Sequence, residues 1–289
     1  MALSKEVVAW GLEVPEGPVV LGPGRVAFVE QMLGRVSLYD DGTVSVVAQG
    51  PGSPNSIVLG SDGELYAAQN GGAVGFWPPE NLCTPGIQRI ELDGSIEEVA
   101  TSVAGVAFGA PNDLVFGPDG RLYVTDPGER YDRGNRAAVN RLFALGHDGG
   151  ETLLEVAPVY INGLGFTTDG VLCWVESYDR HVCLLVDGSR QLLAQLPPLH
   201  VPDGLDVAED GRLFITTVTS HGIDIVSRHG ELLELLYLDD EALPTNCCFE
   251  GSTLWVTDFG TDHQRERGRG RLWRVETDAI GARVFRGSL

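Results

Sequence analysis

The chain has 289 residues, 43% of them hydrophobic and 21% charged, and its 41 acidic residues outnumber 20 basic ones to give a net charge of −21. This composition is that of a globular protein and excludes a disordered or fibrous one. The negative charge argues against nucleic acid and anionic membrane surfaces as partners, because both bind clustered Lys and Arg. No segment reaches the ~18 apolar residues of a membrane-spanning helix.

The N-terminal residues and the cysteines together predict a cytoplasmic protein. Residues 1–13 contain two acidic residues and no long apolar run, unlike a signal peptide. The five cysteines show no Cys-x-x-Cys spacing, so we expect reduced thiols and neither a disulfide framework nor a zinc site. These cysteines are Cys83, Cys173, Cys183, Cys247 and Cys248.

A short pattern occurs six times along the chain. Each copy opens on a residue with a side-chain oxygen, continues with alternating apolar residues and then reaches a turn. In five copies the turn glycine stands eight residues after the opening residue, and four of these glycines follow Asp, which is a strong hairpin signal. The sixth copy, over residues 246–258, has a hairpin two residues shorter. The five turn glycines are Gly24, Gly63, Gly120, Gly170 and Gly211.

The spacing of the copies predicts an all-β protein, a six-bladed β-propeller. The copies begin 39, 57, 50, 41 and 43 residues apart, which leaves room for a four-stranded antiparallel blade in each. No stretch has a sustained helical period. We therefore expect one propeller domain over residues 1–289, with a central channel. The last copy lacks a strand beside 272–275, and residues 7–12 are expected to complete it and so close the ring.

The six opening residues are expected to meet at one rim of the channel, because the first strand of each blade lines it. If these six positions only formed turns, at least one of them would be expected to hold Gly, Ser or Lys. All six carry a side-chain oxygen, which favours a cation site. Ca²⁺ fits best, because it takes 6–8 oxygen ligands, and Mg²⁺, Mn²⁺, Fe²⁺ and Zn²⁺ are the alternatives. The ring consists of Glu16, Asn55, Asn112, Asn162, Asp203 and Asn246.

Other polar residues and loops are weaker candidates. Asp126 and Glu176 stand fourteen residues after the opening residues of their copies, and Asp258 has the corresponding place in the shorter copy. A structural role is favoured for Asp126 and Asp258. For Glu176 a substrate-facing role is equally open. His221 is interpreted as a surface or capping residue rather than a group at the channel mouth. Long loops over 69–86, 127–140 and 260–270 are candidates for functional loops.

These motifs resemble the gluconolactonase/regucalcin (senescence-marker-protein) family of hydrolases. The resemblance rests on Pro-Glu-Gly-Pro at 15–18, Pro-Asn-Asp-Leu-Val-Phe at 111–116, Asn-Gly-Leu at 162–164, Pro-Asp-Gly-Leu at 202–205 and Leu-Trp-Val-Thr-Asp at 254–258. It covers nearly the whole chain and implies a six-bladed propeller with one divalent metal in the channel, most often calcium.

The resemblance also implies roles for single residues. Glu16, Asn162 and Asp203 match the family's metal ligands, and Asn112 matches a further ligand of organophosphate-hydrolysing relatives. Asn112 and Asp113 match a substrate-binding pair, and Asp203 matches the proposed general base or nucleophile. Regucalcin-type members have an Arg two residues before Asn112, where this chain has Ala110. This difference puts a sugar-acid lactone substrate in doubt, unless an arginine of the next loop, Arg130, Arg133 or Arg136, replaces it.

The expected function is that of a metal-dependent lactonase. The cation would polarise the lactone carbonyl, and Asp203 would deprotonate water or attack directly. The net charge favours a neutral lactone over an anionic one. Three alternatives stay open: an organophosphate or other ester hydrolase using the same site, a condensing enzyme similar to strictosidine synthase, and a non-enzymatic calcium-binding or scaffold propeller. The condensing enzymes normally use a Glu base without metal, so the oxygen ring speaks against that one. The natural substrate, the physiological metal and the oligomeric state are not specified by the sequence.

Overall fold

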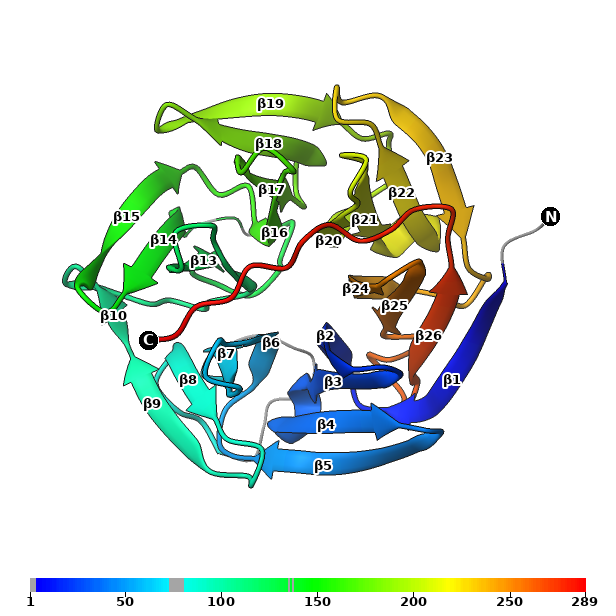
Figure 1. The fold of residues 1–289 in the computed structure, drawn as a ribbon, viewed down its shortest axis with the longest axis horizontal. Helices are drawn as coiled ribbons and strands as arrows, with labels where there is room; N and C mark the ends of the chain where they lie inside the picture. The colour runs from blue at the N-terminus through cyan, green and yellow to red at the C-terminus, as the bar shows by residue number, and fades with distance from the viewer. Residues whose placement is uncertain (1–3, 73–80, 135, 137) are drawn as a thin grey trace.

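Six antiparallel four-stranded sheets surround a central channel in the structure, a computed structural model that describes residues 4–72, 81–134, 136 and 138–289 (Figure 1). The predicted six-bladed β-propeller is confirmed. The described residues contain two 3-10 turns, η1 (Gln31–Leu33) and η2 (Val218–Ser220), and no α-helix. None of the helical segments in these ranges could cross a bilayer.

Each blade runs outward from the channel through four strands. The innermost strands are β2 (Pro15–Gly22), β6 (Pro54–Leu59), β12 (Leu114–Phe116), β16 (Ile161–Phe166), β20 (Pro202–Val207) and β24 (Pro244–Glu250). The second strands are β3 (Arg25–Glu30), β7 (Leu65–Gln69), β13 (Leu122–Asp126), β17 (Leu172–Glu176), β21 (Leu213–Thr217) and β25 (Thr253–Asp258). The third are β4 (Arg35–Asp40), β8 (Gly86–Ile90), β14 (Asn140–Gly146), β18 (His181–Val186), β22 (Gly222–Val226) and β26 (Gly270–Glu276).

The outermost strands show how the ring closes. Five of them follow their blades directly, and the sixth is the N-terminal strand β1, which pairs antiparallel with β26 from Lys5 opposite Val275 to Leu12 opposite Gly270. The last blade is thus built from both ends of the chain, which joins the first and last segments of the ring. The outermost strands are β5 (Thr43–Gln49), β9 (Ile96–Ala100), β15 (Gly149–Val156), β19 (Ser189–Gln195), β23 (Leu232–Tyr237) and β1 (Lys5–Leu12). A small hairpin, β10 (Ser102–Val103) and β11 (Val106–Ala107), follows β9.

The recurring Asp-Gly pairs form the turns between first and second strands. All five turn glycines have positive φ, between 67° and 89°, which a side chain disfavours. Before the glycine, Asp119 and Asp210 each accept a hydrogen bond from the backbone N–H two residues on, at 3.1 and 3.0 Å. The Asp side chain and the Gly backbone therefore specify the turn together.

The hydrophobic core consists of six clusters, one between each pair of neighbouring blades. The ring-closing cluster joins Phe28 of the first blade to Trp255 and Leu272 of the last. Between blades three and four, Tyr123 and Phe166 meet edge to face with ring centroids 5.0 Å apart. This packing fixes each innermost strand against its neighbours and makes the channel a rigid scaffold.

The C-terminal tail, residues 277–289, crosses one mouth of the channel (Figure 1, red). Its backbone is hydrogen-bonded to several blades: the Ala282 N–H donates to the Val207 carbonyl at 2.8 Å, and the Gly287 carbonyl accepts from Ser61 at 2.7 Å. The terminal Leu289 N–H donates to the Tyr66 hydroxyl at 3.0 Å. The tail therefore covers this mouth.

Candidate active site

Two cavities occupy opposite ends of the channel. The upper cavity, about 320 Å³, is lined by residues that open the inner strands and by Tyr131, Tyr160 and His263 from loops. The lower cavity, about 290 Å³, is lined by residues deeper in the same strands, among them Asp113 and Asp206, and by tail residues 282–286.

Five of the six predicted ring residues line the upper cavity. Each comes from a different blade, at or just before its innermost strand, and four of the side chains are buried while that of Asp203 is half-buried. The structure thus brings together side chains that are distant in the sequence. The five residues are Glu16, Asn55, Asn112, Asn162 and Asp203.

The prediction that Asn246 belongs to this ring is wrong. In the pairing of β24 with β25, Pro244 lies opposite Asp258, just as Pro202 lies opposite Thr217 in the fifth blade. Thr245 therefore occupies the position equivalent to Asp203, and Asn246 lies one position deeper, in the lower cavity. The shortened hairpin of the sixth copy shifted the alignment by one residue.

The glycines that follow the ring residues have a steric reason. A Cβ placed on Gly204 would lie 2.2 Å from Asn246 Oδ1, and one on Gly163 would lie 2.6 Å from the Asp203 carbonyl oxygen. A Cβ on Gly17 would lie 2.4 Å from the Cα of Ser56. Inner strands approach so closely below the ring that a side chain cannot fit, which explains the Glu-Gly, Asn-Gly and Asp-Gly pairs.

Hydrogen bonds distinguish the amides of the ring. Asn162 Nδ2 donates to Ser177 Oγ at 3.0 Å and to Asp203 Oδ1 at 2.7 Å, which uses the donors of the amide and leaves its carbonyl oxygen as acceptor. Asn112 hydrogen-bonds with the Tyr160 hydroxyl. By contrast, Asn55 Oδ1 already accepts a hydrogen bond from Gln31 Nε2 at 2.8 Å. Asn55 is thus the least suited of these amides to bind a cation through oxygen.

The two carboxyl groups of the ring lie in an environment that disfavours negative charge. Burial raises the pKa of Glu16 well above its usual value, and the carboxylates of Asp203 and Asp113 raise it further. Burial also raises the pKa of Asp203 to about 7, against the hydrogen bond from Asn162. A bound cation would offset both effects, because a nearby positive charge favours the carboxylate form.

The chemistry of the donor set fits a hard divalent cation. Within the ranges that the structure covers, no three His, Cys, Asp or Glu side chains form a metal-binding group. The ring instead offers two carboxylates and amide oxygens, which Ca²⁺ and Mg²⁺ accept and which softer metals favour less.

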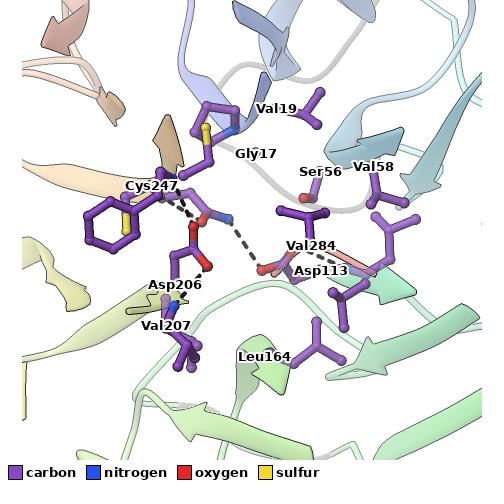
Figure 2. Close-up of a pocket in the computed structure, with 18 of the residues that line it drawn as sticks. Gly17, Val19, Ser56, Val58, Asp113, Leu164, Asp206, Val207, Cys247 and Val284 are labelled. Atoms are coloured by element: carbon purple, nitrogen blue, oxygen red, sulfur yellow. Dashed lines mark hydrogen bonds between the residues drawn. The ribbon is translucent and has the colours of Figure 1, made fainter. Parts of the chain in front are cut away.

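Asp113 and Asp206 point into the lower cavity (Figure 2). Asp113 Oδ1 accepts the Leu114 N–H at 2.9 Å, and Asn246 Nδ2 donates to Asp113 Oδ2 at 3.3 Å. The carboxylate of Asp206 accepts the N–H groups of Val207 and Phe249 at 2.7 and 2.8 Å, while burial raises its pKa to about 6. A ligand in the upper cavity would meet Asn112 first, and substrate contact by Asp113 stays a prediction.

The walls of the upper cavity contain residues that sequence reasoning missed. Val14, Tyr160 and Val201 each stand two residues before a ring residue, at the position where the third blade has Ala110. Val14 and Tyr160 both have φ of 56°, which is unusual for β-branched and aromatic residues. Such strain persists where the surrounding structure fixes it, commonly at functional sites. The sequence signal that could have identified these three wall residues is their constant position, two residues before a ring residue.

Two of the long loops contribute to this cavity. Arg130 and Tyr131 line it, whereas Arg133 donates to the Tyr178 carbonyl oxygen at 2.8 Å and Arg136 pairs with Asp179 at 3.2 Å. Arg130 is thus the one of the three candidate arginines that lines it. The third loop, 260–270, contributes His263 and Gln264, while residues 73–80 of loop 69–86 lie outside the described residues.

His263 and the second set of polar residues are held by other protein groups. His263 Nδ1 lies 3.0 Å from the Gly260 carbonyl oxygen, and burial lowers the pKa of its imidazole. Glu176 forms two hydrogen bonds with Arg190, both at 2.6 Å, and belongs to the interior of its blade, which supports the structural reading. Asp126 accepts three backbone N–H groups at 2.8 Å, and Asp258 pairs with Arg271 at 2.7 Å, as expected of structural residues.

Fold and site together define a six-bladed β-propeller with an oxygen-lined floor in one cavity. Residues 14–260 match the family described as the SMP-30/Gluconolactonase/LRE-like region. The chain belongs to this family, and the resemblance seen in its motifs is confirmed.

Individual relatives agree with this assignment. A curated gluconolactonase of Zymomonas mobilis is 28% identical over 231 residues, which are 72% of this chain and 61% of that protein, so the match spans less than two thirds of the relative's length. A gluconolactonase structure from Xanthomonas campestris covers 95% of this chain and 89% of its own, with a TM-score of 0.74 and 20% identity. A structure from Agrobacterium tumefaciens described as a calcium-binding protein, regucalcin, has a TM-score of 0.75 and 14% identity, with coverage of 99% and 97%. At these identities the two structures show the shared fold.

Proposed function

We propose that this protein is a metal-dependent hydrolase that opens a lactone. The observation that carries the proposal is the meeting of four oxygen-bearing side chains, from four blades, at the floor of a cavity large enough for a small ligand. The curated gluconolactonase from Zymomonas mobilis supports the reaction class. The substrate is a small neutral molecule, because the floor is acidic and the whole chain carries a charge of −21.

Glu16, Asn112, Asn162 and Asp203 would hold one divalent cation. Calcium is the first choice, because carboxylate and amide oxygens are its ligands and the Agrobacterium tumefaciens relative is described as calcium-binding. When bound, the cation would supply Lewis-acid polarisation of a carbonyl group.

Asp203 is the residue proposed to act on the substrate. Asn162 donates to one carboxylate oxygen of Asp203 at 2.7 Å, which leaves the second oxygen as the one proposed to act as base. As general base, that oxygen removes a proton from water while the water oxygen bonds to the carbonyl carbon. The ring C–O bond then breaks, and its oxygen takes up a proton to give the hydroxy acid. Direct attack by Asp203 through an acyl intermediate is the alternative.

Asn112 and Tyr160 position the substrate. Their side chains are hydrogen-bonded to each other, which restricts the orientation of the Asn112 amide in the cavity. Burial and the Asp203 carboxylate raise the pKa of Tyr160, so its hydroxyl remains protonated in the working pH range.

Asp203→Asn tests the proposal against a matched control in the same strand. Asp206→Asn changes another aspartate, three positions on and in the lower cavity. With calcium present, we expect Asp203→Asn to lower kcat/KM for lactone hydrolysis by about 10²–10⁴-fold. Asp206→Asn should stay near wild type, and excess chelator should abolish wild-type turnover.

Full turnover by an Asp203→Asn variant that still binds metal would exclude Asp203 as base or nucleophile. Absence of lactone hydrolysis by the calcium-loaded wild type, with calcium binding intact, would favour a calcium-binding or scaffold propeller.

A further inference from the structure

We propose that the upper cavity selects neutral lactones that carry an apolar or aromatic substituent over polyhydroxylated sugar-acid lactones. The proposal rests on the proposed lactonase function and specifies its substrate class. Its basis is the contrast between the floor of the cavity, which is polar, and the described part of its wall, which is largely apolar.

The wall above the ring consists of aliphatic and aromatic side chains from several blades. Aliphatic groups come from the segments that lead into β2, β20 and β24, and aromatic rings come from the loop before β14, the segment before β16 and the segment after β25. A lactone held at the floor by its carbonyl would direct its ring substituent into this wall, where burial of apolar surface is favourable. The wall residues are Val14, Tyr131, Tyr160, Val201, Leu243 and Phe259.

The aromatic side of this wall is fixed before any ligand binds. The rings of Tyr131 and Tyr160 meet edge to face at 5.1 Å, and both contact Tyr178, at 5.0 and 5.4 Å. The Tyr178 hydroxyl accepts the backbone N–H of Asp132 at 2.8 Å, which anchors the loop that carries Tyr131. A wall with fixed side chains loses little conformational entropy when a flat substituent binds.

Three of the polar side chains beside this wall already have protein partners. Thr219 donates to the Leu199 carbonyl oxygen, Gln31 donates to Asn55, and His263 Nδ1 contacts the Gly260 carbonyl oxygen. The several hydroxyl groups of a sugar lactone would lose water here without gaining an equal number of hydrogen bonds, which disfavours binding. Among the described lining residues, Arg130 is an exposed positively charged residue that directly precedes Tyr131 of the wall.

The test compares two neutral lactones of different polarity. Calcium-loaded wild type is assayed with dihydrocoumarin and with glucono-1,5-lactone, and each kcat/KM is divided by the uncatalysed rate in the same buffer, which removes intrinsic reactivity. We expect the normalised value for dihydrocoumarin to be at least about tenfold higher, since each mismatched contact in a binding pocket changes selectivity by about 10–200-fold.

Leu243→Asn should lower this ratio at least about tenfold, because it places an amide in the apolar wall. Leu233→Asn, a change on the exposed face of β23, should leave the ratio unchanged. If Leu243→Asn does not fold, Val201→Thr, which is nearly equal in shape, provides the same comparison. A normalised preference for glucono-1,5-lactone, or a ratio unaffected by the wall substitutions, would overturn the substrate class and leave the lactonase function standing.

Failure of the lactonase function has a different signature. If neither lactone is hydrolysed, calorimetric titration with 3,4-dihydroquinolin-2(1H)-one, the unreactive lactam of the same shape, still measures the wall. Binding that Leu243→Asn weakens and Leu233→Asn does not would support the apolar ligand class without hydrolysis. No binding of the lactam to the wild type would contradict it.

Discussion

The two ends of the channel are built from the same six inner strands, yet they differ in what their polar groups can still bind. At the upper end, Asn162 and Asp203 are oriented by each other and each retains an oxygen, while Glu16 accepts the Gly17 N–H at 2.7 Å through one of its two oxygens. At the lower end, Asp113 and Asp206 accept backbone N–H groups or the amide of Asn246. A buried carboxylate is therefore not by itself a site; the availability of its oxygens decides what it can bind.

The covering of the two ends differs in the same sense. The tail crosses the lower mouth and is fixed by backbone hydrogen bonds to inner strands and turns (Figure 1). The upper mouth is instead bordered by loops that contribute side chains such as Tyr131 and His263. One end of the ring is thus closed by the tail, and the other is lined by loops, where binding residues are usually found.

The largest expected effect is loss of metal from the upper end. We expect calcium binding to weaken by more than about tenfold in each of Glu16→Gln, Asn162→Ala and Asp203→Ala. Mutation of residues that only hydrogen-bond to metal ligands already lowers metal affinity by about 10–100-fold. Asn55→Ala is the matched control within the ring, since its oxygen already binds Gln31. Calorimetric titration with Ca²⁺ measures all four variants.

Equal losses in all four variants would mean that the ring acts as a whole and that the hydrogen bonds do not distinguish its members. Unchanged affinity in Glu16→Gln, Asn162→Ala and Asp203→Ala would refute the ligand set.

A smaller effect, on stability, is expected from substituting a glycine between the two cavities, where the inner strands approach each other closely. Gly204→Ala should lower the free energy of unfolding by about 1–3 kcal/mol, because its Cβ would overlap Asn246. Gly22 is the last residue of β2, and the nearest atom would lie 4.0 Å from a new Cβ there. The free energy of unfolding of Gly22→Ala should therefore stay within about 1 kcal/mol of wild type. Urea unfolding measures both, and equal values would contradict the steric account.

The smallest effect is expected at the tail. Phe285 packs against the clusters on both sides of the third blade and meets Phe166 edge to face at 5.9 Å. Phe285→Ala should cost about 1–2 kcal/mol of stability, because its ring is only partly buried, and leave lactone turnover unchanged. A turnover loss larger than the stability loss explains would show that the tail couples to the upper end.

The fold was predictable because its repeat is local. Each of the five turns uses a glycine with positive φ, and in four of them Asp precedes the glycine, so the pattern recurs at a constant distance from the opening residues. The strand from residues 7–12 was also visible in the sequence, and in the structure it begins at Lys5. The tail was not predictable, because its path depends on contacts with distant blades.

The site was predictable only where repeats keep their register. The spacing of the repeats predicted five ring residues correctly. In the last blade the hairpin is shorter, so the same spacing assigned Asn246 to the ring position that Thr245 occupies. The walls escaped prediction because Tyr131 and His263 come from irregular loops. The five cysteines are free thiols in the structure, and both the reducing environment and the cytoplasmic location stay predictions.

Crystallography of calcium-soaked protein with anomalous scattering tests the central claim most directly. The account predicts one cation at the floor of the upper cavity, with oxygens of Glu16, Asn162 and Asp203 at ~2.3–2.6 Å and Asn112 completing the protein ligands. A cation bound instead between Asp113 and Asp206, or none in the channel at saturating calcium, would contradict it.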